Sequence, residues 1–247
     1  LLQDISREVE RAKRIHEQVV PIRYSAIKGM DVYSKYAVGE SVGGEFLDVF
    51  PLENKILITL SSSSTYSGTS LLLSYLPQFK EKKDLTPQKI TDFVSALTLE
   101  YKKIAPALLE EKKTNSFQLF LAVLDAKDLS LEGFKFGGQH LISEKKLLLG
   151  ENELFFMQEN IQRSHFRLLL NPSEKLALVS SGLRANTKDI MGEKDLISFI
   201  KDHLAQESSD FINEVFFRLK KGRESDFLTF DASLIKIEVG SNVLFQV

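Results

Sequence analysis

Residues 116–136 read SFQLFLAVLDAKDLSLEGFKF. Two apolar runs, at 116–125 and 130–136, are separated by a short polar turn that includes Asp125 and Asp128. Apolar runs of this length that are bounded by turn residues are typical of paired antiparallel strands. The stretch therefore predicts a hairpin within an antiparallel sheet.

Further strand-like runs lie on both sides of this hairpin, at 31–37, 44–50, 55–61, 139–142, 146–149, 153–157, 165–170, 175–181, 226–238 and 242–246. Two helices, at about 69–79 and from Thr86-Pro87 onward, interrupt the strands, with Pro106 as a kink or an end. Two more helices are predicted at about 193–205 and 209–221. This order predicts an α+β fold in which two packed antiparallel sheets are flanked by helix pairs.

The composition of the 247 residues excludes several classes of protein. Hydrophobic residues make up 43% and charged residues 27%, which is a globular composition, and the net charge is −2. A near-neutral chain argues against a role in coating nucleic acid. The absence of cysteine excludes disulfides and thiolate metal sites, and no apolar run reaches the ~18 residues of a membrane span.

Residues 1–20 predict a helix that Pro21 ends, ahead of one domain over 21–247. Leu2, Ile5, Val9 and Ala12 recur every three or four positions, as in a coiled-coil seam. Two interpretations stay open: the helix packs on its own domain, or it joins two copies into a homodimer. Because the chain begins without methionine, we expect it to be a piece of a longer protein.

Six segments together resemble a known family. They are 18–21 (QVVP), 42–48 (VGGEFLD), 58–67 (ITLSSSSTYS), 134–140 (FKFGGQH), 176–183 (LALVSSGL) and 230–235 (FDASLI). Their order and spacing are similar to the SpoIIE/RsbU branch of the bacterial PPM-type serine/threonine phosphatases, over about 220 residues. The resemblance implies the PPM-phosphatase-like α-β-β-α sandwich.

The resemblance also implies a metal site, and this sequence departs from it. Active members hold two manganese or magnesium ions through aspartates in four of these motifs, and the ions activate a water that attacks a phosphoserine or phosphothreonine. The corresponding positions here are Glu45, Ser62, Ser181 and Phe230. Serine is a weak ligand and phenylalanine is none, so we expect no two-metal centre and no resident cofactor.

Glu45, Asp48 and Asp231 are the acidic residues that remain near these motifs. One interpretation is that the aspartates make ordinary turn and strand-end hydrogen bonds. The alternative is that the three carboxylates hold one manganese or magnesium ion in an atypical, active phosphatase.

Residues 39–43 (GESVG) match the G-x-S-x-G pattern of serine hydrolases, with Ser41 in the nucleophile's place. That motif needs a strand, a sharp turn and then a helix, whereas a strand is predicted after Ser41. The four histidines, His16, His140, His165 and His203, show no acid partner in a recognisable order. We interpret Ser41 and His140 as turn residues.

The function expected from the sequence is that of an inactive PPM-type domain that binds a protein in bacterial signalling. Active relatives dephosphorylate STAS-type regulators, so a STAS-type or other signalling protein is the expected partner. An active phosphatase and a purely structural role are the alternatives. The expected location is the cytoplasm, either alone or as the cytoplasmic part of a longer membrane-anchored protein.

Overall fold

The structure is a computed structural model that describes residues 21–40, 44–63, 66–81, 84–110, 117–150, 152, 155, 160–187, 190–221 and 227–241. The helix predicted at 1–20, with Leu2, Ile5, Val9 and Ala12, lies outside these ranges. Ser41 and the strand predicted at 242–246 lie outside them as well, as do all but one of residues 153–157.

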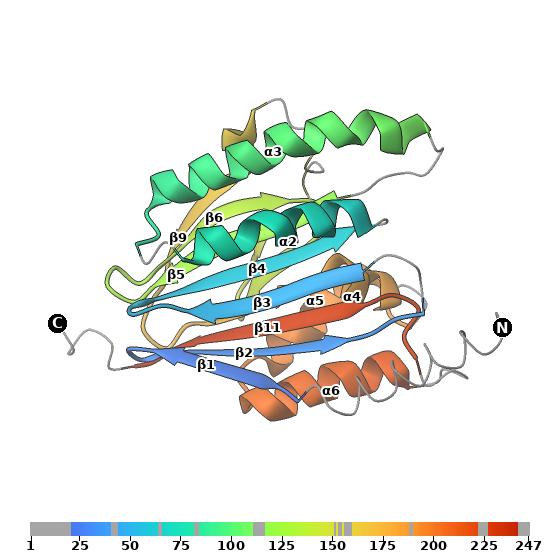
Figure 1. Cartoon of the computed structure of the whole chain (residues 1–247). Coiled ribbons are helices and arrows are strands. Elements are labelled where there is room, and N and C mark those ends of the chain that lie inside the picture. The colour runs from blue at the N-terminus through green and yellow to red at the C-terminus, as the bar shows by residue number, and fades with distance from the viewer. Residues whose placement is uncertain are drawn as a thin grey trace.

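Eleven strands in the described part of the chain form two antiparallel sheets (Figure 1). Six strands are ordered β1-β2-β11-β10-β7-β8, and five are ordered β3-β4-β5-β6-β9. The strands are β1 Arg23–Ile27, β2 Met30–Ala37, β3 Gly44–Pro51, β4 Lys55–Ser63, β5 Phe117–Asp125, β6 Ser130–Phe136, β7 His140–Ser143, β8 Leu147–Leu149, β9 His165–Leu169, β10 Lys175–Val179 and β11 Ala232–Val239.

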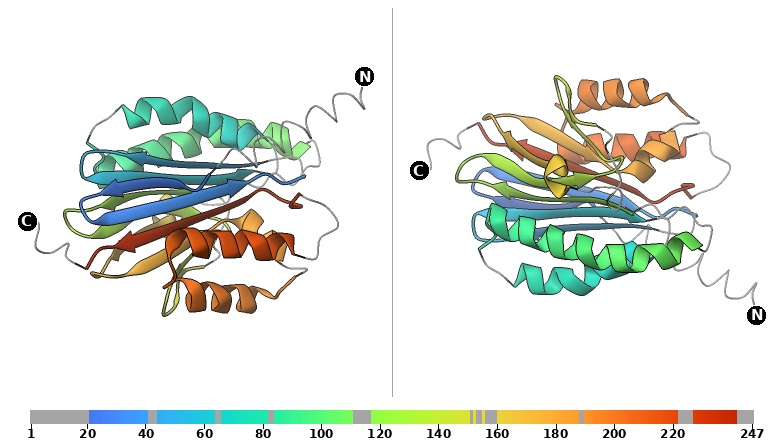
Figure 2. Two further views of the ribbon diagram at one scale, coloured as in Figure 1. Left: turned by 90° about the horizontal axis from the view of Figure 1, so that it is seen from below. Right: turned by 90° about the horizontal axis from the view of Figure 1, so that it is seen from above.

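Helices cover the outer face of each sheet, as the views from below and above show (Figure 2). The five-stranded sheet is covered by α2 (Tyr66–Lys80) and α3 (Pro87–Glu110), and the six-stranded sheet by α5 (Glu193–His203) and α6 (Ser208–Lys220). A short helix, α4 (Ser181–Thr187), follows β10, and a 3-10 turn, η2 (Ile161–Ser164), precedes β9. The predicted α-β-β-α sandwich is confirmed.

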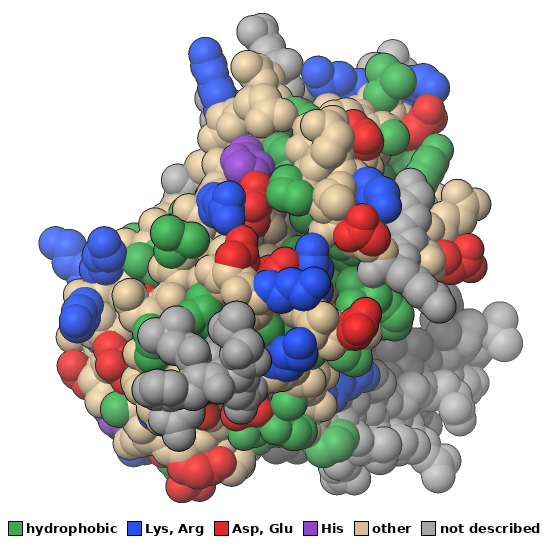
Figure 3. All heavy atoms as spheres, turned by 90° about the vertical axis from the view of Figure 1, so that its left-hand side faces the viewer, with side chains coloured by type: hydrophobic (Ala, Val, Ile, Leu, Met, Phe, Trp, Pro, Cys, Tyr) green, Lys and Arg blue, Asp and Glu red, His purple; other side chains and the backbone are tan. Residues whose placement is uncertain are grey.

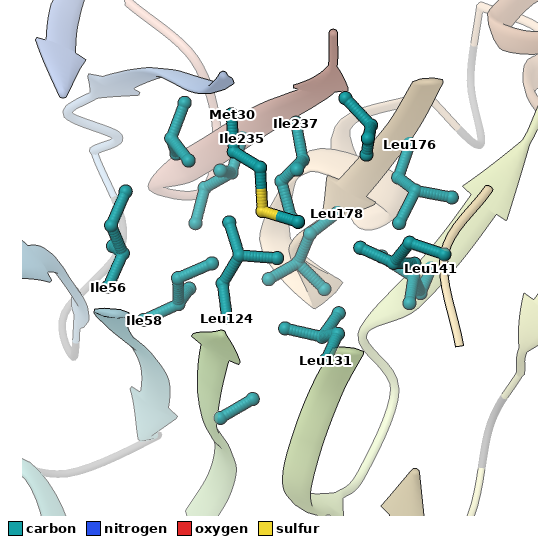
Figure 4. Packing of buried hydrophobic residues seen from close by; sticks show 14 of the residues in the cluster. Met30, Ile56, Ile58, Leu124, Leu131, Leu141, Leu176, Leu178, Ile235 and Ile237 are labelled. Carbon is teal, nitrogen blue, oxygen red and sulfur yellow. The ribbon is translucent and has the colours of Figure 1, made fainter. Parts of the chain in front are cut away.

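Successive side chains along each strand point to opposite faces of the sheet. One face packs against the other sheet and the other face packs against the helices, which gives two apolar layers. On β4, Ile56, Ile58 and Leu60 face the opposite sheet, while Leu57 faces α2 and α3. Leucine, isoleucine and methionine side chains of both sheets meet in the layer between them (Figure 4). Burial of these alternating rows holds the two sheets face to face and fixes their register.

The structure corrects four details of the predicted elements. The strand predicted to reach 181 ends at Val179, because helix α4 begins at Ser181. The strand predicted from 226 begins at Ala232. Helix α3 continues past Pro106 to Glu110. Strand β1 (Arg23–Ile27) was not predicted, because its residues show no apolar alternation.

Candidate functional site

The four positions of the implied metal site meet at one end of the sandwich, where β2, β4 and β10 finish and β3 and β11 begin. Glu45 and Ser62 are direct cross-strand partners on β3 and β4. Ser62 follows Leu60 on the face that looks toward the other sheet, and Ser62 pairs in turn with Gln118 on β5. A polar row, Glu45-Ser62-Gln118, therefore ends the apolar layer between the sheets.

Ser181 and Gly182 reach this row from the other sheet, at the start of α4. The helix begins here because the Ser180 hydroxyl accepts the backbone N–H of Leu183 at 3.0 Å, which caps its first turn. The N–H of Gly182 donates to Glu45 Oε1 at 2.9 Å. A Cβ on Gly182 would lie 2.0 Å from the Asp231 carbonyl oxygen, so only glycine permits this approach.

Asp231 joins the two sheets through three hydrogen bonds to its carboxylate. The N–H of Gly39 donates to Oδ1 at 2.6 Å, and the Tyr36 hydroxyl and the N–H of Glu45 donate to Oδ2 at 2.8 and 3.1 Å. Because both oxygens already accept hydrogen bonds, the carboxylate holds the start of β3 against the end of β2.

Glu45 has an unusual environment for a carboxyl group. Burial raises its pKa to about 8, and the nearby charge of Asp231 acts in the same direction. The hydroxyls of Ser233 and Ser180 and the N–H of Gly182 act in the opposite direction. The buried Oε2 atom has no partner within ordinary hydrogen-bond geometry. At neutral pH the protonated form of Glu45 is therefore the favoured one.

Phe230, at the fourth position, is 42% exposed on the loop before β11. The Asn186 side chain holds this loop: its Oδ1 accepts the N–H groups of Thr229 and Phe230 at 3.0 and 3.2 Å, and its Nδ2 donates to the Phe230 carbonyl at 2.7 Å. These bonds keep residues 229–230 out of the sheet, which explains why β11 begins later than predicted.

Asp48 does not join the other two acidic residues. Leu47 and Val49 pack between the sheets, whereas Phe46 and Phe50 pack toward α2 and α3. By alternation, Asp48 faces the helices while Glu45 faces the other sheet, and the Asp48 carboxylate pairs with Lys80 of α2. The structure therefore brings together Glu45 and Asp231, and it does not bring Asp48 to them.

A small cavity runs along the free edge of β3 beside these residues. Its volume is about 280 Å³. It is lined by Arg23, Ser34, Tyr36, Glu45, Phe46, Leu47 and Asp48. Within the described ranges, no three His, Cys, Asp or Glu side chains come close enough together to hold a metal ion.

The three histidines within the described ranges occupy separate surroundings. His140, interpreted from the sequence as a turn residue, is instead the first residue of strand β7, where it is buried opposite Val179. His165 lies 3.1 Å from a Glu132 oxygen, and His203 Nδ1 lies 2.8 Å from the Phe199 carbonyl oxygen.

Three residues that hold the segments around the site were not singled out from the sequence: Gln118, Arg184 and Asn186. Gln118 Oε1 accepts the N–H of Gly138 at 2.8 Å, and Arg184 donates to the Gly138 carbonyl. Together they place the turn after β6 against the site. The signal for α4 was present, since a serine N-cap at 180 is followed by Leu183 and Arg184, which favour helix.

Comparison with solved structures identifies the fold, although no protein-family model and no curated protein matches this chain. The SiaA-PP2C domain of Pseudomonas aeruginosa matches with a TM-score of 0.69 at 12% identity, over 96% of this chain and 98% of that one. The PP2C phosphatase domain of SpoIIE from Bacillus subtilis, solved with a fragment of its regulatory domain, matches with 0.61 at 14%, over 89% and 64%. RsbX in complex with magnesium matches with 0.60 at 9%, over 89% and 100%. The chain therefore has the fold of the bacterial PP2C (PPM-type) serine phosphatases.

Proposed function

We propose that this chain is a phosphatase-fold domain that does not hydrolyse phosphoesters and acts by binding another protein in a bacterial regulatory pathway. One observation carries the proposal. The place where the fold would hold two divalent ions contains one glutamate, two serines and a phenylalanine, so only one of the four positions offers a carboxylate.

These residues do not fit two divalent cations. Magnesium and manganese need several charged oxygens to offset four positive charges and the lost hydration. Glu45 already accepts the Gly182 N–H, and the Asp231 carboxylate already accepts three hydrogen bonds. Serines at 62 and 181 add no charge, and Phe230 offers no ligand atom. An aspartate cluster without metal would repel itself, so the substitutions also suit a metal-free fold.

Turnover of a generic phosphate ester with manganese tests the loss of activity. We expect the wild-type rate to equal that of Glu45→Ala, since neither protein would assemble a reactive water. Glu53→Gln, a change at an exposed turn, is the matched control for preparation and folding. A wild-type rate that Glu45→Ala abolishes and Glu53→Gln keeps would support the alternative, an active phosphatase with an atypical metal site.

The binding role is supported by the kind of protein in which this fold occurs. The solved structures include a phosphatase domain of the cell fate determinant SpoIIE and the RsbU and RsbW domains of a Mycobacterium tuberculosis protein. We propose a STAS-type or other signalling protein as the partner. Cross-linking of the full chain in cells, followed by mass spectrometry, should recover such a protein; recovery of structural assemblies alone would favour the structural role.

A homodimer through residues 1–20 is part of the same proposal. The support is the apolar seam of Leu2, Ile5, Val9 and Ala12. Light scattering should give a dimer for the native sequence and a monomer when Ile5 and Val9 carry charged side chains. A native monomer would contradict the proposed homodimer.

No helix in the described part of the chain is long and apolar enough to span a membrane.

A further inference from the structure

Strand β3 (Gly44–Pro51) lies at the edge of the five-stranded sheet and pairs only with β4 in the described part of the chain. In an antiparallel pair, the N–H and C=O groups of every second residue point toward the partner strand, and those of the residues between point away. The N–H of Glu45 donates to the Asp231 carboxylate, so it points away from β4. By the same alternation, Leu47 and Val49 direct their N–H and C=O groups away from β4.

The far end of β3 shows the same alternation. The N–H of Leu52 donates to the Lys55 carbonyl at 2.7 Å, so the even-numbered residues are those that bond to the other strand of the hairpin. Pro51 is odd-numbered, and its missing N–H therefore removes no bond from the ladder with β4. Within the described ranges, Leu47 and Val49 thus each present one unpaired donor and one unpaired acceptor along the free edge of β3.

The side chains of β3 already have partners inside the molecule. Leu47 and Val49 pack between the sheets, and Phe46 and Phe50 pack toward α2 and α3. A strand that is rich in β-forming residues and has an unpaired edge is a template for one more strand. In strand addition the backbone supplies affinity, and the alternate side chains of the added strand supply specificity.

The cavity of about 280 Å³ along this edge has a polar floor. Figure 1 shows β2 and β1 below β3. Ser34 and Tyr36 lie on the inner face of β2, because Val32 in the same alternation packs between the sheets. Arg23 is the direct cross-strand partner of Ser34, so it shares this face. Every second side chain of a strand added to β3 would therefore point toward polar groups.

Arg23 is the group of this cavity whose charge is not matched. Its side chain is exposed and makes no ion pair within the described ranges. The Asp48 carboxylate pairs with Lys80, and the Glu45 carboxyl accepts the N–H of Gly182. A guanidinium presents a planar set of donors that suits a carboxylate. The side chain of an added strand that faces Arg23 should therefore be acidic.

Basic and acidic side chains are intermixed over the end of the molecule that carries the β3–β4 turn (Figure 3). Attraction by net charge alone gives little selectivity at such a surface, whereas backbone pairing combined with one ion pair gives more. We propose that β3 binds an extended segment of a partner protein as one more strand of its sheet, and that Arg23 selects a segment with an acidic side chain. The inference rests on the proposed binding function and names its surface and the chemistry of its partner.

Selection from a phage-displayed library of random nine-residue peptides against the full chain tests this surface. We expect enrichment of sequences rich in β-branched or aromatic residues, in which an acidic residue recurs at one position. Synthetic peptides with these sequences should bind the wild type in fluorescence anisotropy.

Two variants locate the binding. Val49→Pro removes an outward N–H and leaves the ladder with β4 intact, so it should lower the affinity about tenfold. Arg23→Gln should lower the affinity about tenfold for the acidic peptide, and not for a peptide in which glutamine replaces the acidic residue. The matched controls are Val49→Ala, which keeps the N–H, and Arg163→Gln, at an exposed position on η2, and both should bind like the wild type.

Thermal melts should show that the variants fold, and Arg23→Gln keeps the test decisive if Val49→Pro does not. A selection without enrichment would overturn the proposal, as would peptides that bind both variants as tightly as the wild type. A dimer in light scattering that Val49→Pro makes monomeric would also overturn it, because a second copy would then occupy the edge. None of these outcomes decides the loss of phosphatase activity, which turnover with manganese tests separately.

Discussion

Glu45 differs from aspartate by one methylene, and its carboxyl lies against Gly182 in the first turn of α4, the helix that follows β10 of the opposite sheet. Oε1 accepts the Gly182 N–H at 2.9 Å, and Asp231 holds the backbone N–H of the same glutamate at 3.1 Å. The carboxyl thus occupies the space between the sheets instead of opening toward solvent. A carboxyl that links β3 to the start of α4 in this way acts as a structural element of the fold.

Glu45 should make stability depend on pH. Its pKa in the folded chain, about 8, lies above the ordinary value of 4.5 that the unfolded chain restores. The group therefore contributes its full stability below pH 4.5, and that contribution is lost as the pH rises through 8. Urea unfolding across this range should show the loss in the wild type and not in Glu45→Gln. Glu53→Gln, at an exposed turn, should follow the wild type; a loss that Glu45→Gln retains would refute the assignment.

Asp231 should be needed for stability in the absence of any metal. Asp231→Ala leaves the N–H groups of Gly39 and Glu45 and the Tyr36 hydroxyl without their acceptor, which should cost about 2 kcal/mol. Urea unfolding in a chelator measures this. Asp84→Ala, at a site whose side chain is 70% exposed, is the control and should cost almost nothing. If Asp231 were chiefly a metal ligand, its removal from metal-free protein would stabilise the fold instead.

For individual residues, the sequence predicted which positions lie together at the site but not the hydrogen bonds that they make. The resemblance placed Glu45, Ser62, Ser181 and Phe230 at one site, and the structure brings their elements together. The separation of Asp48 was predictable in principle from strand alternation, because positions 45 and 48 differ by an odd number. The role of Asn186 was not, since its partners lie 43 and 44 residues away and no local pattern links them.

The elements follow the sequence closely where apolar alternation is strong. Strands β2, β4, β5 and β6 and helices α5 and α6 lie within a few residues of their predicted bounds. Strand β1 was missed because it lies at the edge of its sheet, and four of its five residues are not buried. Helix α4 was missed because seven residues are too few to show a helical period.

Lys236 on β11 contacts the turn between α5 and α6, a contact that no local sequence pattern predicts. This lysine on β11 is fully buried, and burial lowers its pKa. Its Nζ donates to the Gln206 carbonyl at 2.6 Å and lies 2.7 Å from Glu238 Oε1. Lys175 donates to the neighbouring Ala205 carbonyl at 2.8 Å. Two lysines therefore tie the α5–α6 turn to the sheet beneath it.

Replacing Lys236 alone should destabilise the fold more than replacing Lys236 and its partner Glu238 together. Lys236→Met leaves Glu238 without its closest cation, and we expect a loss of about 3 kcal/mol in urea unfolding. Adding Glu238→Gln should recover part of this loss, because it removes a carboxylate that would then have only Lys175, at 3.8 Å, as a cationic partner. Lys221→Met, at an exposed position, should have little effect. Additive effects of the two substitutions would show that the pair is not coupled.

The whole molecule presents different chemistry at its two ends. One end carries the polar row of Glu45, Ser62 and Gln118 together with Asp231. The other end carries a pocket of about 480 Å³ between the β7–β8 turn and the segment that joins β9 to β10, lined by leucines and by polar and charged residues. The sandwich between them is common to the bacterial PP2C structures at 9–14% identity. The fold is therefore shared at low overall sequence identity, and fold alone does not fix the activity.

Titration calorimetry of manganese and magnesium into the metal-stripped chain, paired with thermal melts, tests the central claim most directly. A variant with aspartate at positions 45, 62, 181 and 230 is measured alongside it, because it restores four carboxylates at the site. For the wild type we predict no binding heat and no change in melting temperature. Micromolar binding that raises the melting temperature of the wild type would contradict the account and would point to a rebuilt metal site in a working phosphatase.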